Sequence, residues 1–334
     1  MSRKTNERGL QLAGVIALSL ITLVLYANPR VYIPLGEGNM VIAVDSKTDK
    51  IIAQYPGTKE AHGLVATPDG EYLVAGSLFE TPLKPNEPKD KANSKLYLVH
   101  PAHGHVMSVI PVAGSTHHQA ITPDGRYVLS THISRGELSV YDMKQNKIVK
   151  RVKTGLAPNY AVISKDGTKV YVTNTGSNNI AEIDLKTWKV LRTLESGPGP
   201  EHMVLSKDGK TLYVTNPFAG KVSFVSIASG KVTKDYKIGS NLHGIDLADD
   251  GVTLFLSSKG DNKFVALDTG TGKMRQKKLE PAPYHLNTIS GSGKVYVSSR
   301  KKSIIWVLDQ KTLKTVNTIK LPAGAAHQMA IVPR

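Results

Sequence analysis

The chain has 334 residues, with 43 Lys and Arg against 27 Asp and Glu, so its formal net charge at pH 7 is +16. It contains no cysteine, which excludes disulfide bonds, thiolate nucleophiles, zinc sites with cysteine ligands, covalently attached c-type haem and a lipoprotein anchor. The length admits one large all-β domain or two smaller domains. The charge indicates either an anionic partner, such as lipid headgroups, or a basic solvated surface.

The N-terminus contains a predicted membrane segment. Arg3, Lys4 and Arg8 lie in a basic tip, residues 1–8, ahead of an apolar run from Gly9 to Ala27. A helix of about this length approaches the ~30 Å hydrocarbon core of a bilayer. The basic residues favour a cytoplasmic N-terminus with everything after the helix outside. We therefore predict a single-pass anchor in the cytoplasmic membrane and a periplasmic domain, with a cleaved signal peptide as the alternative.

Three short apolar segments follow the membrane segment. They read VYIPL, NMVIAVD and KIIAQYP, and lie between Val31 and Pro56. Their short length, their Val and Ile content and the polar turns between them predict three β-strands.

From His62 onward the sequence repeats with a period of 42 residues over most of its length. The clearest copies are NYAVISKDGTKVYVTN from Asn159, EHMVLSKDGKTLYVTN from Glu201 and HGIDLADDGVTLFLSS from His243. Each copy reads as a short strand, an Asp-Gly turn and a second strand rich in Val, Tyr and Leu. A third strand and a lysine-rich fourth follow, and four antiparallel strands per repeat predict one blade of a β-propeller. No helix-period segment separates the strands, which excludes TIM-barrel and doubly wound folds.

One repeat is longer than the others. His62 and His117 are 55 residues apart, and the excess lies in ETPLKPNEPKDKAN, from Glu80 to Asn93. Proline and charge predict a loop there. It starts at the end of the propeller where the first strands begin, so we expect either a lid over the channel mouth or a tolerated surface insertion.

Counting the repeats predicts how the fold closes. The first strands begin at His62, His117, Asn159, Glu201, His243, His285 and His327. The last copy, HQMAIVPR, has no second strand, while the three strands near the N-terminus have no first strand before them. The sequence therefore predicts an all-β, seven-bladed propeller over residues 31–334, in which the C-terminal strand pairs with the N-terminal three and removes the free sheet edges.

Two of the second strands carry a family motif. VYVTN (Val170–Asn174) and LYVTN (Leu212–Asn216) each follow a KDG turn, and the chain resembles the YVTN-repeat propeller family over roughly 31–334. That family lies close to the haem d1 domain of cytochrome cd1 nitrite reductases and more distantly to the propeller of nitrous oxide reductase. The resemblance implies the fold, and these propellers host several unrelated functions.

Histidines occupy one column of the repeat. The first strand of each blade lines the central channel, so a column of the repeat becomes a ring at one channel mouth, and imidazole suits copper, zinc and iron. We predict five metal ligands: His62, His117, His243, His285 and His327. Neighbouring positions give three candidate cofactor-binding residues: His118, His132 and His202. Asn159 and Glu201 fill the remaining column positions, and Glu201 is the candidate catalytic acid or base.

The histidine-bearing strands carry a second resemblance. THHQAITPDG (Thr116–Gly125) and HGLVATPDG (His62–Gly70) are similar to the strands that hold the copper cluster of nitrous oxide reductase-like propellers, which implies copper. The present chain is far shorter and lacks the cysteine-bearing electron-entry domain, so reductase activity is not implied. Haem d1 or another small ligand in the channel, and purely structural imidazoles, are the alternatives.

The sequence leaves three classes of function open. The first is a cofactor-binding propeller, either a metallo-oxidoreductase or an assembly protein for a cofactor. The second is a scaffold for a protein or redox partner in the periplasm. The third, nucleic-acid binding, is the weakest, because the lysine-rich outer strands lack interleaved aromatic residues. We expect a separate group of histidines to lie at the surface: His100, His103 and His105.

Overall fold

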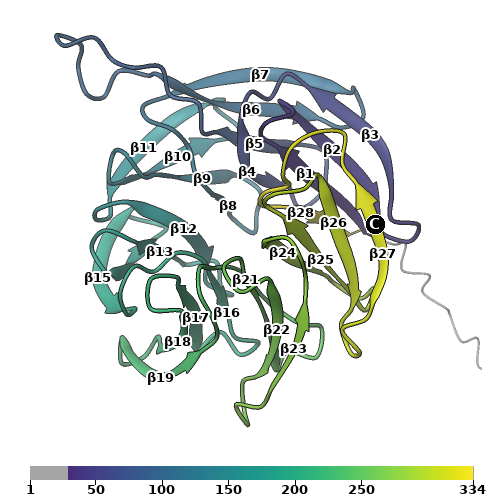
Figure 1. Ribbon diagram of the computed structural model, residues 1–334. Helices are drawn as coiled ribbons and strands as arrows, with labels where there is room; N and C mark the ends of the chain where they lie inside the picture. The colour runs from purple at the N-terminus through teal and green to yellow at the C-terminus, as the bar shows by residue number, and fades with distance from the viewer. Residues whose placement is uncertain (1–28, 334) are drawn as a thin grey trace, which may run out of the picture.

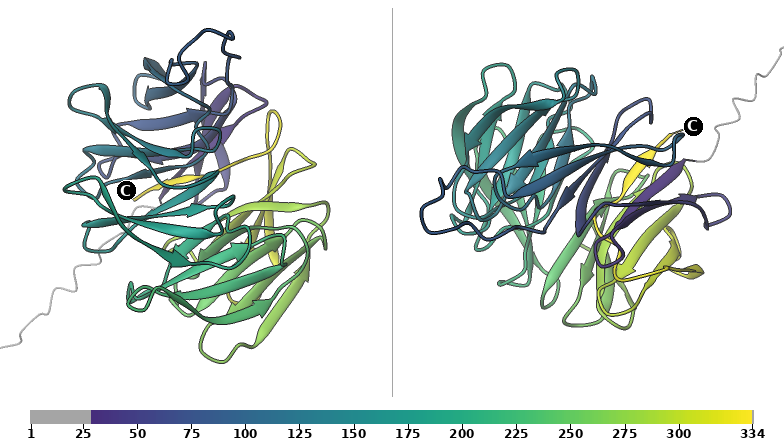
Figure 2. Two further views of the ribbon diagram at one scale, coloured as in Figure 1. Left: turned by 90° about the vertical axis from the view of Figure 1, so that its left-hand side faces the viewer. Right: turned by 90° about the horizontal axis from the view of Figure 1, so that it is seen from above.

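The computed structural model describes residues 29–333, and in it seven four-stranded antiparallel sheets surround a central channel (Figure 1). This arrangement confirms the all-β, seven-bladed propeller. Two further views show the sheets set side by side around one axis (Figure 2). The predicted basic tip and membrane segment, residues 1–8 and 9–27, lie outside the described residues. Within residues 29–333 no helix is long and apolar enough to cross a bilayer.

Each blade has four strands, which lie side by side in order from the channel to the outer rim. The innermost strands are β4 (Ala61–Ala66), β8 (Gln119–Ile121), β12 (Pro158–Ile163), β16 (Met203–Leu205), β20 (Leu242–Leu247), β24 (Pro283–Ile289) and β28 (Ala330–Val332). The second strands are β5 (Leu73–Ser77), β9 (Tyr127–His132), β13 (Lys169–Asn174), β17 (Thr211–Asn216), β21 (Thr253–Ser258), β25 (Lys294–Ser299) and β1 (Arg30–Leu35). The third strands are β6 (Ser94–His100), β10 (Glu137–Asp142), β14 (Asn179–Asp184), β18 (Lys221–Ser226), β22 (Lys263–Asp268), β26 (Ile304–Asp309) and β2 (Met40–Asp45). The outer strands are β7 (His105–Val112), β11 (Lys147–Lys153), β15 (Lys189–Glu195), β19 (Lys231–Lys237), β23 (Met274–Lys278), β27 (Thr315–Lys320) and β3 (Lys50–Pro56).

Burial follows strand position because the core lies between the faces of neighbouring blades. The second strand β13 is buried at all but its first residue, whereas the outer strand β15 is exposed at all but one. One cluster joins Leu129 and Val140 of one blade to Val170 and Val172 of the next. Each such buried aliphatic side chain contributes about 1.5–3 kcal/mol relative to exposure, so the ring depends on contacts between blades.

The ring closes between the two ends of the chain, as predicted. β28 pairs antiparallel with β1, with Arg30 opposite Val332 and Tyr32 opposite Ala330. We call the face where the inner strands begin the mouth face, and the face that carries the Asp-Gly turns the turn face. β1 begins at the turn face and ends at the mouth face, where Gly36 lies against the His327 ring.

A repeating hydroxyl fixes the start of the inner strand at four blade boundaries. Thr173 Oγ1 accepts the Tyr160 N–H at 3.0 Å within its own blade and donates to the Glu201 carbonyl at 2.6 Å in the next. The same links across blade boundaries run from Thr131 to the Asn159 carbonyl, from Ser257 to the Tyr284 carbonyl and from Ser298 to the Ala326 carbonyl. These hydroxyls therefore hold the residues at the channel mouth at a common height.

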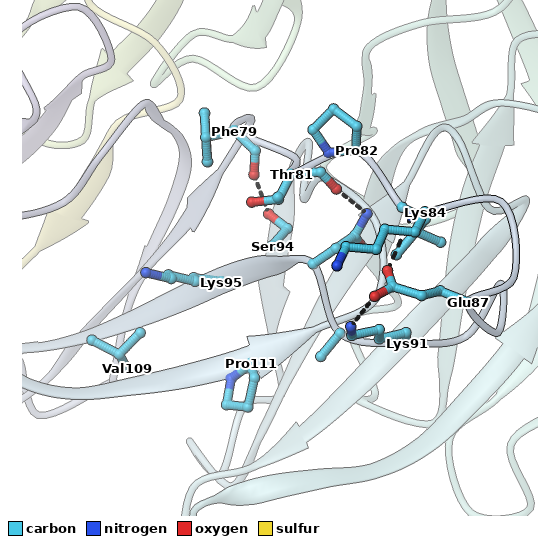
Figure 3. Close-up of a pocket in the computed structure, with 13 residues that line it drawn as sticks. Phe79, Thr81, Pro82, Lys84, Glu87, Lys91, Ser94, Lys95, Val109 and Pro111 are labelled. Atoms are coloured by element: carbon cyan, nitrogen blue, oxygen red, sulfur yellow. Dashed lines mark hydrogen bonds and ion pairs between the residues drawn. The ribbon is translucent and has the colours of Figure 1, made fainter.

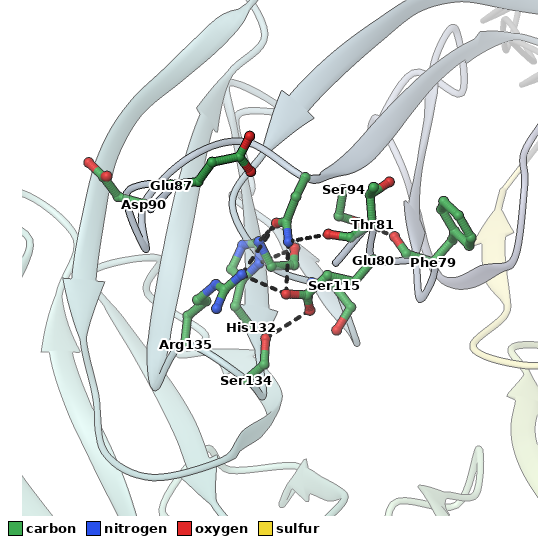
Figure 4. A network of polar contacts seen from close by, with 12 residues as sticks. Phe79, Glu80, Thr81, Glu87, Asp90, Ser94, Ser115, His132, Ser134 and Arg135 are labelled. Atoms are coloured by element: carbon green, nitrogen blue, oxygen red, sulfur yellow. Dashed lines mark hydrogen bonds and ion pairs between the residues drawn. The ribbon is translucent and has the colours of Figure 1, made fainter. Parts of the chain in front are cut away.

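The insertion between β5 and β6 projects outward from the rim of the ring (Figure 1), and does not form the lid that was one of our two interpretations. Its base is tied down by Glu80, whose carboxylate accepts from the guanidinium of Arg135 at 2.6 Å, the Ser115 N–H at 3.0 Å and the Ser134 hydroxyl at 3.0 Å (Figure 4). Further out, Arg151 of β11 donates to the Asp90 carbonyl at 3.2 Å. A cavity of about 650 Å³ lies between the loop, β6 and β7, away from the channel (Figure 3).

Candidate metal centre

Seven imidazoles contact one another at the mouth of the channel. Their ring centroids lie 4.2–5.7 Å from their neighbours. The seven are His62, His117, His118, His202, His243, His285 and His327. The structure thus brings together all five predicted metal ligands and two of the three predicted cofactor-binding histidines.

Three overlapping triads within this histidine cluster have metal-ligand spacing. The triads are His62–His285–His327, His62–His117–His118 and His118–His202–His285, and in each one the three ring nitrogens lie within 4.8 Å of one another. Three imidazoles with a fourth position open is a common arrangement around zinc and related ions. His62, His118 and His285 each belong to two triads, so these three residues are central to the cluster.

His243 joins the cluster through His285. The Nε2 atoms of the two rings are 3.2 Å apart. Two nitrogens that share a tetrahedral ion at 2.0–2.1 Å would lie about 3.3 Å apart. The spacing of His243 and His285 is therefore compatible with two ligands of one ion, although His243 belongs to none of the three triads.

Several ring nitrogens of the cluster are buried without a hydrogen-bond partner. Both nitrogens of His62 are in this condition, as are Nε2 of His118, Nε2 of His202 and Nδ1 of His327. A buried polar atom left unpaired costs on the order of 1–3 kcal/mol. Unpartnered imidazole nitrogens in a group of histidines at metal-ligand spacing are donors that a metal ion would satisfy.

The imidazoles of the cluster are held in the neutral form that binds metals. Burial lowers the pKa of His62, His118, His202 and His285 well below the usual value of 6.5, and neighbouring imidazoles lower it further. Burial likewise lowers the pKa of His117 to about 4, and that of His327 to about 3 with help from the charge of Arg300.

A shared backbone acceptor orients two of the rings. The Asn159 carbonyl lies 3.3 Å from Nδ1 of His117 and 3.0 Å from Nδ1 of His118. A carbonyl can only accept, so these contacts place the proton on Nδ1 and leave Nε2 with a free lone pair. Hydrogen bonding of the far nitrogen is how metal-binding imidazoles are commonly oriented.

Glu201 lies at the edge of the cluster, where it was predicted. Its Oε2 is 3.3 Å from Nδ1 of His243, a distance suited to an ion pair, but the angles do not make a hydrogen bond. Burial raises the pKa of Glu201, and the positive charge of Lys259 opposes that shift. Among the described residues it supplies the one carboxylate within 4 Å of a cluster nitrogen.

A bulge explains why adjacent residues share the mouth. Strict strand alternation would point neighbours such as Asn159 and Tyr160 to opposite sides, but the register of β12 with β13 shifts by one residue between Pro158 and Ala161. Such bulges re-aim side chains at the ends of strands. In the blade of β8, pairing in the named strand begins only at Gln119, so His117 and His118 both precede it and both reach the cluster.

His132, the third predicted cofactor-binding histidine, lies outside the cluster. Its Nδ1 donates to the Gly114 carbonyl at 3.1 Å and its Nε2 accepts from the Ser139 hydroxyl at 2.7 Å. Both nitrogens are therefore engaged within the protein. In other blades Asn174 and Asn216 occupy the same position and make similar contacts.

Sequence reasoning missed the tyrosines and cations beside the cluster. Tyr284 stacks on His243 with centroids 4.1 Å apart, and Tyr160 contacts His118 and His202. Lys259 lies 5.1 Å from the centre of the Tyr284 ring. The available signal was a Tyr next to a column position, since Tyr160 directly follows Asn159 and Tyr284 directly precedes His285. The predicted surface histidines lie on the turn face, where His100 and His103 stack at 4.0 Å.

Comparison with known proteins supports the fold. Residues 116–253 match the model of a family described as YNCE-like beta-propeller, which bears out the propeller resemblance suggested by VYVTN and LYVTN. No curated protein matches the sequence.

Several solved structures share this fold with little sequence identity to the present chain. Hydrazine synthase of Kuenenia stuttgartiensis is 20% identical with a TM-score of 0.68, over 82% of this chain and 95% of that chain. The periplasmic gluconolactonase PpgL of Pseudomonas aeruginosa is 17% identical with a TM-score of 0.72, over 91% and 99%. The dihydro-heme d1 dehydrogenase NirN, solved in complex with DHE, is 16% identical with a TM-score of 0.65, over 88% and 64%. At these identities the likeness shows the fold alone.

Proposed function

For a seven-bladed propeller with this histidine cluster, we propose that the protein binds a transition metal at the channel mouth, with copper as the metal. The observation that carries the proposal is the set of three overlapping triads of buried histidines, several of whose nitrogens have no partner. The ligand set is drawn from the five predicted column histidines together with His118 and His202.

The donor chemistry favours copper. All atoms of the three triads are imidazole nitrogens, whereas calcium and magnesium require oxygen ligands. Nitrogen sites bind copper most tightly among the divalent first-row metals. Copper bound at such a site can serve electron transfer, catalysis or delivery of the ion to another protein. In a catalytic role, Glu201 would be the group that holds or moves a proton, at its carboxylate beside His243.

Haem d1 or a related tetrapyrrole is the second candidate, and the structural likeness to NirN supports it. The packing of the cluster supports it less. The imidazoles already contact one another, with centroid distances down to 4.2 Å, so a macrocycle would have to lie over the mouth rather than among the rings. A scaffold that holds a protein partner is the remaining candidate, and it would leave the orphaned nitrogens unexplained.

Metal analysis of the purified full-length protein tests this function. We expect copper to bind in stoichiometric amounts and to raise the melting temperature, because it binds only the folded chain. The double variants His62→Ala/His285→Ala and His118→Ala/His285→Ala each break all three triads and should abolish both effects. His132→Asn is the matched control, since it replaces a buried histidine outside the cluster by the residue found in equivalent blades. Full metal content in the cluster variants, or a parent protein indifferent to copper, zinc and iron, would refute the site.

We also propose that residues 9–27 anchor the propeller to the cytoplasmic membrane, with the propeller in the periplasm. The support is the apolar run and its basic flank. The protein should remain in the membrane pellet after washing with carbonate or high salt. Release into the soluble periplasmic fraction with a mature N-terminus at Asn28 would show a cleaved signal peptide instead.

A further inference from the structure

Two cations lie beside the histidine cluster on the mouth face. The Lys259 ammonium lies 5.1 Å and the Arg300 guanidinium carbon 5.7 Å from the centre of the Tyr284 ring. Tyr284 in turn contacts His243 and His285, with centroids 4.1 and 4.4 Å away. Both positive charges therefore face the same side of the cluster, one aromatic ring away from its nitrogens.

Lys259 has no direct counter-ion. Among residues 29–333 its half-buried ammonium has no hydrogen-bond acceptor and no carboxylate within 4.0 Å. The acidic residue nearest in sequence, Asp261, is paired with Lys263 at 3.3 Å instead. Burial lowers the pKa of Lys259, the more distant charge of Glu201 opposes this, and the like charge of Arg300 adds to it. Arg300 itself is paired with the exposed Glu37 at 3.2 Å.

A metal ion would add uncompensated positive charge beside Tyr284. Lys259 and Arg300 contribute two positive charges there, and Glu201 and Glu37 contribute two negative ones, while the cavity alongside adds Lys59 and Glu60, one charge of each sign. Imidazole ligands are neutral, so a divalent ion in the histidine cluster keeps both of its charges. Such a site, flanked by the half-buried ammonium of Lys259, is electrostatically complementary to an anion.

The space beside the cluster admits such an anion. A cavity of about 360 Å³ opens on the mouth face between Gly36, Lys59, Leu78 and Arg300, and it reaches the cluster at His327. Nδ1 of His327 is one of the nitrogens without a partner. The cavity gives a small ligand a route to the cluster from solvent, and a three-atom anion fits well within its volume.

We propose that the metal-loaded mouth binds one small anion, of the size of azide, nitrite or formate, next to Lys259 and Arg300. This inference rests on the proposed metal site, because the metal supplies the uncompensated charge. Anions of this class would be the substrate or an exchangeable ligand of the centre, and neutral molecules of the same size would bind more weakly.

Azide binding to the copper-loaded, full-length protein tests the inference through its charge-transfer absorption. In Lys259→Met we expect the dissociation constant for azide to rise about tenfold, the effect of removing one nearby charge in a partly desolvated site. Lys259→Arg, which keeps the charge, should bind azide as the parent does. Lys301→Met, which removes an exposed charge from the same face, is the matched control and should change little.

Copper content is measured in every sample, so the two proposals fail separately. Equal azide affinity in the parent and Lys259→Met, with copper present in both, would overturn the anion site and leave the metal site intact. Copper-loaded parent that binds no azide would do the same. A parent protein that takes up no metal would overturn the proposed function, and the anion site with it.

Discussion

The two ends of the channel are built from the same repeat, but they treat polar groups in opposite ways. On the turn face, the aspartate of each of four turns accepts two hydrogen bonds. One comes from the hydroxyl of the residue two positions earlier, at 2.5–2.6 Å, and the other from the backbone N–H two positions later, at 3.0–3.1 Å; the four are Asp69, Asp124, Asp166 and Asp208. At the mouth, the imidazoles are more deeply buried and several of their nitrogens have no partner. Groups that complete their own hydrogen bonds stabilise the fold, whereas groups that leave them open are available to a ligand.

The most severe way to break this arrangement is to open the ring. Deleting residues 327–334 removes β28 and His327 together, and exposes the buried faces of Tyr32 and Val31 on β1. We expect the loss of several kcal/mol of unfolding free energy, because a whole inner strand and its contacts with two blades are lost. Urea unfolding followed by circular dichroism would measure it. Truncation after Val332 is the control and should unfold like the parent; parent-like unfolding of the longer deletion would mean that the ring closes elsewhere.

Single substitutions at the two ends should change stability in opposite directions. Asp124→Ala removes the acceptor of the Thr122 hydroxyl and the Arg126 N–H, and should cost about 1 kcal/mol. His62→Leu replaces a buried ring with two unpartnered nitrogens by an apolar side chain of similar size, and should stabilise the metal-free protein by about 1 kcal/mol. It also breaks two of the three triads and should weaken metal binding.

Urea titrations of metal-free protein measure both changes. If His62→Leu destabilised the metal-free protein as much as Asp124→Ala does, the nitrogens of His62 would have to make hydrogen bonds after all. The two ends of the channel would then not differ in how they treat polar groups.

Acidification should affect the mouth before the turn face. The folded imidazoles have lowered pKa values, about 4 for His117 and about 3 for His327, so below pH 6.5 the unfolded chain binds more protons than the folded chain. Stability should fall from about pH 6.5 towards pH 4, by up to about 1.4 kcal/mol per pH unit for each imidazole that takes up a proton on unfolding.

The turn aspartates respond in a lower range. Hydrogen bonds from Ser164 and Thr168 lower the pKa of Asp166 to about 2, so its contribution is complete above the unfolded value near 4 and is lost below it. Melting temperatures of metal-free protein between pH 7 and 3 would show two phases. His62→Leu removes one of the seven imidazoles and should reduce the first phase only. A melting temperature constant from pH 7 to 4.5 would contradict buried neutral imidazoles.

The smallest effect is expected from the histidines on the turn face. His103 and His105 are exposed, and the double replacement by Ala should change stability by less than about 0.5 kcal/mol. Copper content and the copper-dependent rise in melting temperature should stay as in the parent. A loss of metal in this variant would move the site from the mouth to the opposite face.

The fold could be predicted because several independent features of the repeat indicate the same architecture. The 42-residue period, the Asp-Gly turns and the unpaired strands at the two ends each point to seven blades and to closure between β28 and β1. The histidine column was predictable for the same reason, since a fixed place in the repeat is a fixed place around the axis. The outward direction of the Glu80–Asn93 loop was not, because it depends on the contact of Glu80 with Arg135, 55 residues away.

The extent of the site depends on features that a column cannot show. Tyr160 reaches the mouth through a shift in register of β12, and His118 does so because it precedes the paired part of β8. Alternation alone assigns such residues and their neighbours to opposite sides. Lys259 lies in the connection between β21 and β22, where the repeat gives no reason to look for a ligand contact. His132 shows the opposite error, because its position in the repeat suggested the channel while its two hydrogen bonds hold it inside a blade.

The direction of β1 determines which way the mouth opens. The chain enters the propeller at Arg30 on the turn face, and the histidine cluster lies at the other end of the channel. A propeller tethered through residues 9–27 would therefore stand with its turn face towards the lipid and its mouth towards the aqueous space. Ions, small ligands and a soluble protein could then approach the cluster without passing through the gap between protein and membrane.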